Sequence, residues 1–140
     1  MRVYEAFETS KRLIDEGLQC EIEFGGKVIA RVWVRPTDPN LNRAYARELA
    51  EETVKLKGNG LDDLSPEDDA EILQRIIART VIVRWEWTDQ ADKKDPKLKF
   101  NEKNAIALFK RAPKFFAGIQ QGARQWDRFR KVHEEQAAGN

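Results

Sequence analysis

The chain has 140 residues, enough for one domain with its own hydrophobic core. Hydrophobic residues make up 41% and charged residues 35%, which predicts a soluble globular protein, and the net charge of +1 is too small to argue for nucleic acid by itself. The single cysteine excludes a disulfide within the chain, and no stretch approaches the roughly 20 apolar residues of a membrane helix, so we expect a cytosolic protein without a signal peptide.

Residues 1–36 are predicted to form a short helix followed by a β-hairpin. The helix covers ETSKRLIDEG and ends at Gly17, because glycine readily takes the left-handed conformation that closes a helix. Gly25-Gly26 is a strong signal for a two-residue turn, since both positions of such a turn have positive φ.

The turn predicts which strand residues pair. A regular register pairs Phe24 with Lys27 and Ile22 with Ile29, and puts Ile22 on the face of Trp33. A bulge at the glycines would change this register, and the sequence does not decide between the two. The second strand is apolar on both faces, so we expect it to be more buried and the first strand to be an edge.

Residues 37–88 are predicted to form two helices. The first has Asp38 as its N-cap and Pro39 at its first position. Its expected buried side carries Leu41, Tyr45, Leu49 and Leu56. The second helix starts at Ser65-Pro66 and has an apolar stripe from Ile72 to Val81. The continuation TVIVRWEW is ambiguous because β-branched residues favour a strand, but the helical spacing continues, and we extend the helix to about Arg84.

Residues 89–100 form a predicted polar loop, residues 101–136 the C-terminal helices and residues 137–140 a frayed tail. Asn101 is expected to cap one helix, and Pro113 to begin or kink the last. The fold class is therefore α+β in a single domain of residues 1–140. It contains an N-terminal β-hairpin or small antiparallel sheet packed with about four to five α-helices, and a long C-terminal helix.

The last helix carries an aromatic stripe at helical spacing: Phe115, Ile119, Gly122, Trp126, Phe129 and His133. We predict that its first half, with Phe115, Phe116 and Ile119, packs in the core. For Trp126 and Phe129, core packing and contact with a partner remain equally open. Aromatic residues beside arginines such as Arg130 are typical interface anchors, and Gly122 with Ala123 would leave a shallow spot between the aromatic groups.

Trp85 and Trp87 allow two interpretations. They are either tryptophans of the core or its rim, or part of a partner surface together with the distal last helix. A base-stacking platform is disfavoured because Glu86 and Asp89 are neighbours and such platforms combine aromatics with a basic groove. The predicted partner-binding residues are accordingly Trp126, Phe129, Arg130, Trp85 and Trp87.

The sequence contains no recognisable catalytic or metal-binding pattern. The acids of LDDLSPEDDAE lack the glycine and terminal glutamate of a calcium loop and suit a helix N-terminus instead. His133 has no nameable partner, and Cys20 has no CxxC companion. We therefore expect no catalytic residues, no metal site and no cofactor, and we expect that the protein is not an enzyme.

Three segments and their order resemble the tail assembly chaperones of long-tailed bacteriophages, the siphophage proteins that act on the tape measure protein. These are F-x-x-S-K-x-L-x-x-E-G at residues 7–17, T-V-I-V-R-W at 80–85, and F-N-x-x-N-A-x-x-L-F at 100–109 followed by P-x-F-F at 113–116. Together they span nearly the whole chain.

The resemblance implies a non-catalytic protein of the host bacterial cytoplasm, absent from the mature virion. Its expected partners are the tape measure protein, which it keeps soluble, and the tail tube protein, which it helps recruit. Self-association is expected, because copies bound along one client touch, and no membrane is involved. Two alternatives stay open: a tail or head-tail component retained in the virion, and a nucleic-acid-binding module using the basic C-terminal helix. Residues 101–140 carry a charge of +4 from eight Lys/Arg and four Asp/Glu, but the net charge of the chain argues against nucleic acid.

Overall fold

The computed structural model describes residues 12, 14–59 and 66–125. In chain order its elements are β1 (Leu18–Phe24), β2 (Lys27–Val34), α2 (Arg43–Asn59), α3 (Pro66–Thr80), β3 (Ile82–Trp87), α4 (Gln90–Lys94), the 3-10 helix η2 (Pro96–Leu98), α5 (Glu102–Arg111) and α6 (Pro113–Arg124). The strands form one antiparallel sheet in the order β1-β2-β3. The predicted α+β class is confirmed.

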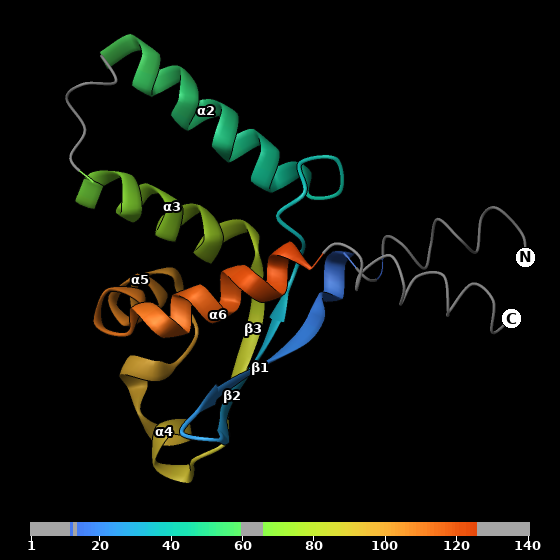
Figure 1. Ribbon diagram of the computed structural model, residues 1–140, viewed down its shortest axis with the longest axis vertical. Helices are drawn as coiled ribbons and strands as arrows, with labels where there is room; N and C mark the ends of the chain where they lie inside the picture. Colours follow the sequence, from blue (N-terminus) through green and yellow to red (C-terminus); the bar gives the residue numbers. More distant parts are fainter. Residues whose placement is uncertain (1–11, 13, 60–65, 126–140) are drawn as a thin grey trace, which may run out of the picture.

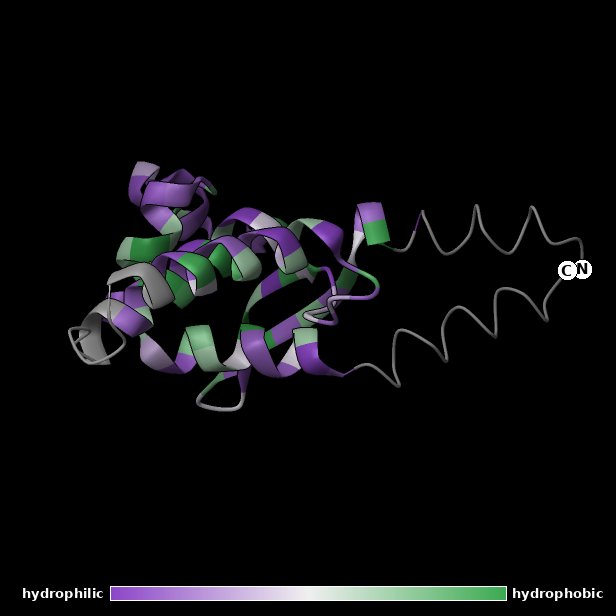
Figure 2. Cartoon of the chain, turned by 90° about the horizontal axis from the view of Figure 1, so that it is seen from above, coloured by the Kyte–Doolittle hydropathy of each residue, from purple (hydrophilic) through white to green (hydrophobic). Residues whose placement is uncertain are grey.

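The described chain has two layers, the sheet and the helices that cover one of its faces. Figure 1 shows α6 crossing in front of the sheet, α5 to the side of the sheet against α6 and α3, and α2 outermost, next to α3. The core lies between the layers, with Val32, Val34, Phe109 and Ile119 almost fully buried. From above, in Figure 2, hydrophobic and hydrophilic residues alternate along the helices, as expected for elements that each bury one side.

The hairpin forms where the sequence predicts it and the glycine turn is regular, but the register shifts further along the strands and not at the glycines. Gly25 and Gly26 have φ of 61° and 78°, and Phe24 pairs with Lys27. The register then shifts between Ile22 and Glu23, so Ile22 pairs with Ala30 and not with Ile29. The shift moves Ile22 to the core face, where it is 6% exposed, away from Trp33.

The predicted extension of the second helix to Arg84 is wrong. The helix ends at Thr80, and Ile82–Trp87 form β3 along the free edge of β2, so the described residues between 37 and 88 form two helices and a strand. Helical spacing continues through this segment, but the ladder with β2 supplies hydrogen bonds that local sequence cannot show. The β-branched residues therefore follow their own preference. β2 is the central strand and β1 an edge, as predicted.

The start of α2 also differs from its prediction. Asp38 only closes a turn, in which its carboxylate accepts the Asn40 N–H at 2.8 Å. The helix begins at Arg43, and the N-cap is Asn42, whose Oδ1 accepts the Tyr45 N–H at 3.1 Å. Leu49, predicted on the buried side, is 38% exposed, and the side chain of Leu56 lies outside the described residues.

Ion pairs hold α2 against its neighbour α3. Glu52 of α2 accepts a hydrogen bond from Arg75 of α3 at 2.7 Å. Arg79 of α3 lies 3.6 Å from Glu48 of α2 and also pairs with Glu102 of α5 at 2.9 Å. The hydrogen bond with Glu102 and the charges of both acids raise the pKa of Arg79.

The segment predicted as a polar loop, residues 89–100, is built from two short helices. Asp89 caps α4 by accepting the Ala91 N–H at 2.8 Å, and Asp95 caps η2 by accepting the Lys97 N–H at 2.9 Å. Asn104 of α5 donates to the carbonyl oxygens of Pro96 and Lys99 at 3.0 and 2.8 Å. The segment is therefore tied to the helical layer, beside the β1–β2 turn (Figure 1).

The C-terminal helices start as predicted. Asn101 caps α5 through the Asn104 N–H at 2.8 Å, and Pro113 is the first residue of α6. The part of the predicted long helix beyond Gln125 lies outside the described residues, as do the tail and the first residues of the N-terminal helix.

Candidate functional site

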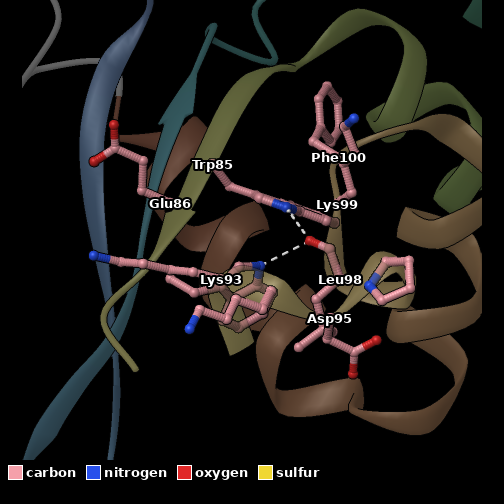
Figure 3. A pocket seen from close by; sticks show the side chains of 10 residues that line it. Trp85, Glu86, Lys93, Asp95, Leu98, Lys99 and Phe100 are labelled. Carbon is pink, nitrogen blue, oxygen red and sulfur yellow. Dashed lines mark hydrogen bonds between the residues drawn. The ribbon is translucent and has the colours of Figure 1, made fainter. Parts of the chain in front are cut away.

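An open groove of about 710 Å³ lies between β3 and the α4–η2 segment, and we call it the tryptophan groove (Figure 3). Aromatic residues from two parts of the chain wall it: Trp85 and Trp87 from β3, and Phe100 from the loop before α5. The rings of Trp85 and Phe100 meet edge to face, with centroids 4.9 Å apart. The groove thus combines an aromatic wall with a polar segment that contributes charged side chains.

Both indoles point their nitrogens at the same acceptor. Nε1 of Trp85 and Nε1 of Trp87 each donate to the carbonyl oxygen of Leu98 at 2.8 Å, as the dashed lines in Figure 3 show. This satisfies the polar end of each ring without a partner molecule and fixes η2 against the sheet.

The two indoles are largely buried, and partner contact through the edges that remain exposed stays a prediction. Trp85 is 8% exposed and Trp87 9%, and the Trp87 ring stacks on Phe115 with centroids 5.5 Å apart. Both rings belong to the core and its rim in the described structure. Only a narrow part of each ring is left to meet a ligand in the groove.

The other predicted partner-binding residues, Trp126, Phe129 and Arg130, lie outside the described residues. The first half of the stripe is core, as predicted, with Phe115 at 5% and Ile119 at 0% exposure. The expected shallow spot at Gly122 is absent, because Cys20 of β1 occupies it: a Cβ on Gly122 would lie 2.6 Å from the sulfur.

Lysines form the charged rim of the tryptophan groove. Lys93, Lys94 and Lys99 line it, all three residues are exposed, and none forms an ion pair with another residue of the described chain. These lysines are not among the site residues predicted from the sequence. The signal was present in the run KKDPKLK, but its alternating charge is also typical of a solvated loop.

The two acids at the groove have partners of their own. Glu86 pairs with Arg84 at 2.9 Å, and Asp95 accepts the Lys97 N–H. The guanidinium of Arg84 also lies 3.5 Å from the centre of the Trp33 ring, a cation–π contact. The charge that remains available at the groove is therefore positive.

A second groove, of about 510 Å³, lies between α3 and the α5–α6 pair and is more apolar. Phe109, Phe116 and Pro113 line it, and an ion pair of Lys110 with Glu71 at 3.5 Å stands at its edge. Gln74 also lines it, and its buried Oε1 has no hydrogen-bond partner within the described chain.

Exposed apolar side chains lie away from both grooves. Val54 on α2 is 70% exposed and Phe24 at the end of β1 is 69% exposed, in addition to Leu49. With the grooves, they are the places where the described chain offers apolar surface to another molecule.

The chemistry-bearing residues give no site in the described part of the chain. Cys20 is buried and its sulfur lies 3.8 Å from the Gly118 carbonyl oxygen. Within that part, His, Cys, Asp and Glu form no group of three or more that could hold a metal ion. His133 and the acids Asp62 and Asp63 lie outside it. None of the helices described there is long and apolar enough to cross a membrane.

Comparison with known proteins identifies a family. A protein-family model described as YdaY prophage protein matches residues 37–140, about three quarters of the chain. The matched region contains α2, α3, β3 and all later elements, and so includes both grooves. No curated protein and no solved structure matches the chain.

Proposed function

The chain belongs to the YdaY prophage protein family and is therefore phage-derived, and from this premise we propose that it is a tail assembly chaperone. In this role it binds the tape measure protein without catalysing a reaction, keeps it soluble and helps recruit tail tube subunits while the tail is built. The resemblance of three segments of the sequence to such chaperones motivates the proposal.

The tryptophan groove is the observation that best supports this function. A chaperone of a long amphipathic helix needs an apolar surface bordered by charges, so that it can shield apolar side chains and still release them. The groove has that construction, with Trp85, Trp87 and Phe100 as its wall and lysines as its rim. The second groove and the exposed Val54 offer further apolar contacts.

Each of these contacts is small, which suits a client that offers many binding segments. Several weak sites along one chain raise the total affinity because each contact holds the next segment at high local concentration. Neighbouring copies on one client would touch, so the proposal includes self-association. It also places the protein in the host bacterial cytoplasm and not in the mature virion.

Co-expression with the tape measure protein of the same prophage tests the proposal. We expect the tape measure protein to be soluble and to co-purify only when this chain is present, with an unrelated small α+β protein as the control. An insoluble client in both cultures would reject the chaperone role. Mass spectrometry of purified particles separates the alternative, because a virion component would be found there and a chaperone would not.

The distal stripe belongs to the same proposal. Replacing Trp126 and Phe129 together with alanine is expected to weaken client solubilisation while the circular dichroism spectrum stays native. Loss of the native spectrum in this double variant would instead identify both residues as core.

A further inference from the structure

We propose that the tryptophan groove binds an acidic segment of a partner protein, in which carboxylates contact Lys93, Lys94 and Lys99 while an apolar side chain lies against the indole edges. This inference rests on the proposed function and adds the chemistry of the client segment. Its basis is charge complementarity.

The lysines at the groove are available to a ligand, whereas the acids are engaged. Lys93, Lys94 and Lys99 form no ion pair within the described residues. Glu86 pairs with Arg84 at 2.9 Å, and Asp95 caps η2. A carboxylate entering the groove would therefore meet ammonium groups that have no competing partner there.

The backbone that carries these lysines is fixed, which favours binding. The Leu98 carbonyl oxygen accepts hydrogen bonds from both indoles, and Asn104 donates to the carbonyl oxygens of Pro96 and Lys99 on either side of it. Because the segment is already ordered, a ligand does not have to order it, and less of the binding free energy is lost as entropy.

The same geometry favours an acidic peptide over a nucleic acid. Bases bind single-strand sites by stacking on exposed aromatic faces, and here Trp85 and Trp87 are only 8% and 9% exposed. Glu86 and Asp95 also line the groove, and although each has a partner, a phosphate backbone with a charge at every nucleotide could not pass along the groove without approaching them. Separate carboxylates on a peptide can reach individual lysines and avoid these acids.

Two designed helical peptides test the proposal by fluorescence anisotropy with the full chain. They share one apolar face and carry either Glu or Lys on the polar face. We expect the Glu peptide to bind about tenfold or more tightly than the Lys peptide. Its affinity should fall as salt rises from about 0.1 M to about 1 M, because the screening length shortens from about 10 Å to about 3 Å.

Charge reversal identifies the groove as the site. The variant with Lys93→Glu, Lys94→Glu and Lys99→Glu should lose affinity for the Glu peptide and gain affinity for the Lys peptide. The control carries Lys97→Glu, Lys103→Glu and Lys114→Glu, which change the net charge equally at exposed positions that do not line the groove. It should keep the preference for Glu. If charge reversal impairs folding, a Lys→Gln version of the groove variant should weaken binding of the Glu peptide without strengthening binding of the Lys peptide.

The proposal would be overturned if the two peptides bound equally tightly, or if the groove and control variants lost the same affinity for the Glu peptide. Tight binding of a single-stranded oligonucleotide that the groove variant abolishes would overturn it in favour of nucleic acid. A groove variant that loses the Glu peptide but still solubilises the tape measure protein fully would show that the client does not use the groove. The chaperone role would then stand. If the native chain fails to solubilise the client, the chaperone role fails, whatever the peptides do.

Discussion

Gly122 of α6 lies directly on Cys20 of β1, so closely that a Cβ on the glycine would be 2.6 Å from the cysteine sulfur. One turn earlier, a Cβ on Gly118 would be 3.0 Å from Cδ1 of Ile22. The two glycines, four residues apart, let the helix approach the edge strand, and this approach closes the core at that edge of the sheet.

Gly122→Ala should therefore destabilise the fold by about 1–3 kcal/mol, as overpacking of a dense core does. Gly118→Ala is the matched control. Its neighbour is the end of a side chain that can turn away, and alanine favours the helix by up to about 1 kcal/mol, so little net change is expected. Urea denaturation measures both.

Since Cys20→Ala removes the clashing sulfur, the double variant with Gly122→Ala should be less destabilised than the sum of the single changes. Strict additivity would contradict the contact.

Asn42→Ala should cost about 2–4 kcal/mol, because it removes an N-cap and leaves buried carbonyls without donors. Asn42 is 3% exposed, and its Nδ2 donates to the carbonyl oxygens of Pro36 and Thr80 at 3.1 and 2.8 Å. Asp38→Ala, which affects only an exposed turn, should cost much less in the same denaturation experiment. Asn42→Asp tests the donors separately: a carboxylate keeps the cap but places charge beside the two carbonyls, so it should not restore stability.

Trp85→Phe and Trp87→Phe should be non-additive. Either single change leaves the Leu98 carbonyl oxygen with one indole donor, whereas the double change removes both. We expect the double variant to lose about 1–2 kcal/mol more than the sum of the singles, the cost of an unsatisfied acceptor. Additive losses would mean that the shared acceptor contributes nothing. A double-variant cycle, in which far-ultraviolet circular dichroism reports unfolding, measures the coupling free energy between the two residues.

Glu52→Gln should loosen α2 more than Lys55→Gln does. Glu52 has a side chain only 13% exposed and accepts from Arg75 at 2.7 Å, whereas Lys55 is 67% exposed and lies 3.5 Å from the same carboxylate. We expect a loss of stability of about 1–2 kcal/mol for the first change and of less than about 0.5 kcal/mol for the second. Hydrogen exchange of the α2 amides locates the effect. Equal protection in both variants would show that the ion pair does not hold the helix.

The pair between Arg79 and Glu102 should not make stability depend on pH near neutrality. The pKa of Arg79 is raised in the folded chain, chiefly by the hydrogen bond with Glu102. Because the pKa of Arg79 is higher in the folded chain, the pair stabilises the fold fully at every pH below the pKa that Arg79 has in the unfolded chain. This stabilisation is lost only when the guanidinium deprotonates in strong alkali. Arg79→Gln and the parent chain should therefore show parallel stability curves between about pH 6 and pH 9. Curves that diverge with rising pH in this range would contradict the assignment.

Local chemistry was enough to predict several elements. The Gly25-Gly26 turn, the Asn101 cap, the start of α6 at Pro113 and the buried first half of its stripe all depend on residues close in sequence. The site was less predictable. Trp85 and Trp87 could be named because two tryptophans so close in sequence are conspicuous. The lysines that share their groove come from a segment whose charge pattern also fits a solvated loop.

By itself, the sequence determined the α+β class, the hairpin and most helix starts, because turns and caps are settled by the φ preferences and hydrogen-bonding groups of neighbouring residues. Only the tertiary structure decided that Ile82–Trp87 form a strand, that Asn42 replaces Asp38 as the cap of α2, and that Ile22 faces the core. In each case the deciding partner is distant in sequence: the open edge of β2, the carbonyl of Thr80, and α6 lying against β1. Hydrogen bonds and packing with such partners outweigh local preferences of a few tenths of a kcal/mol to about 1 kcal/mol.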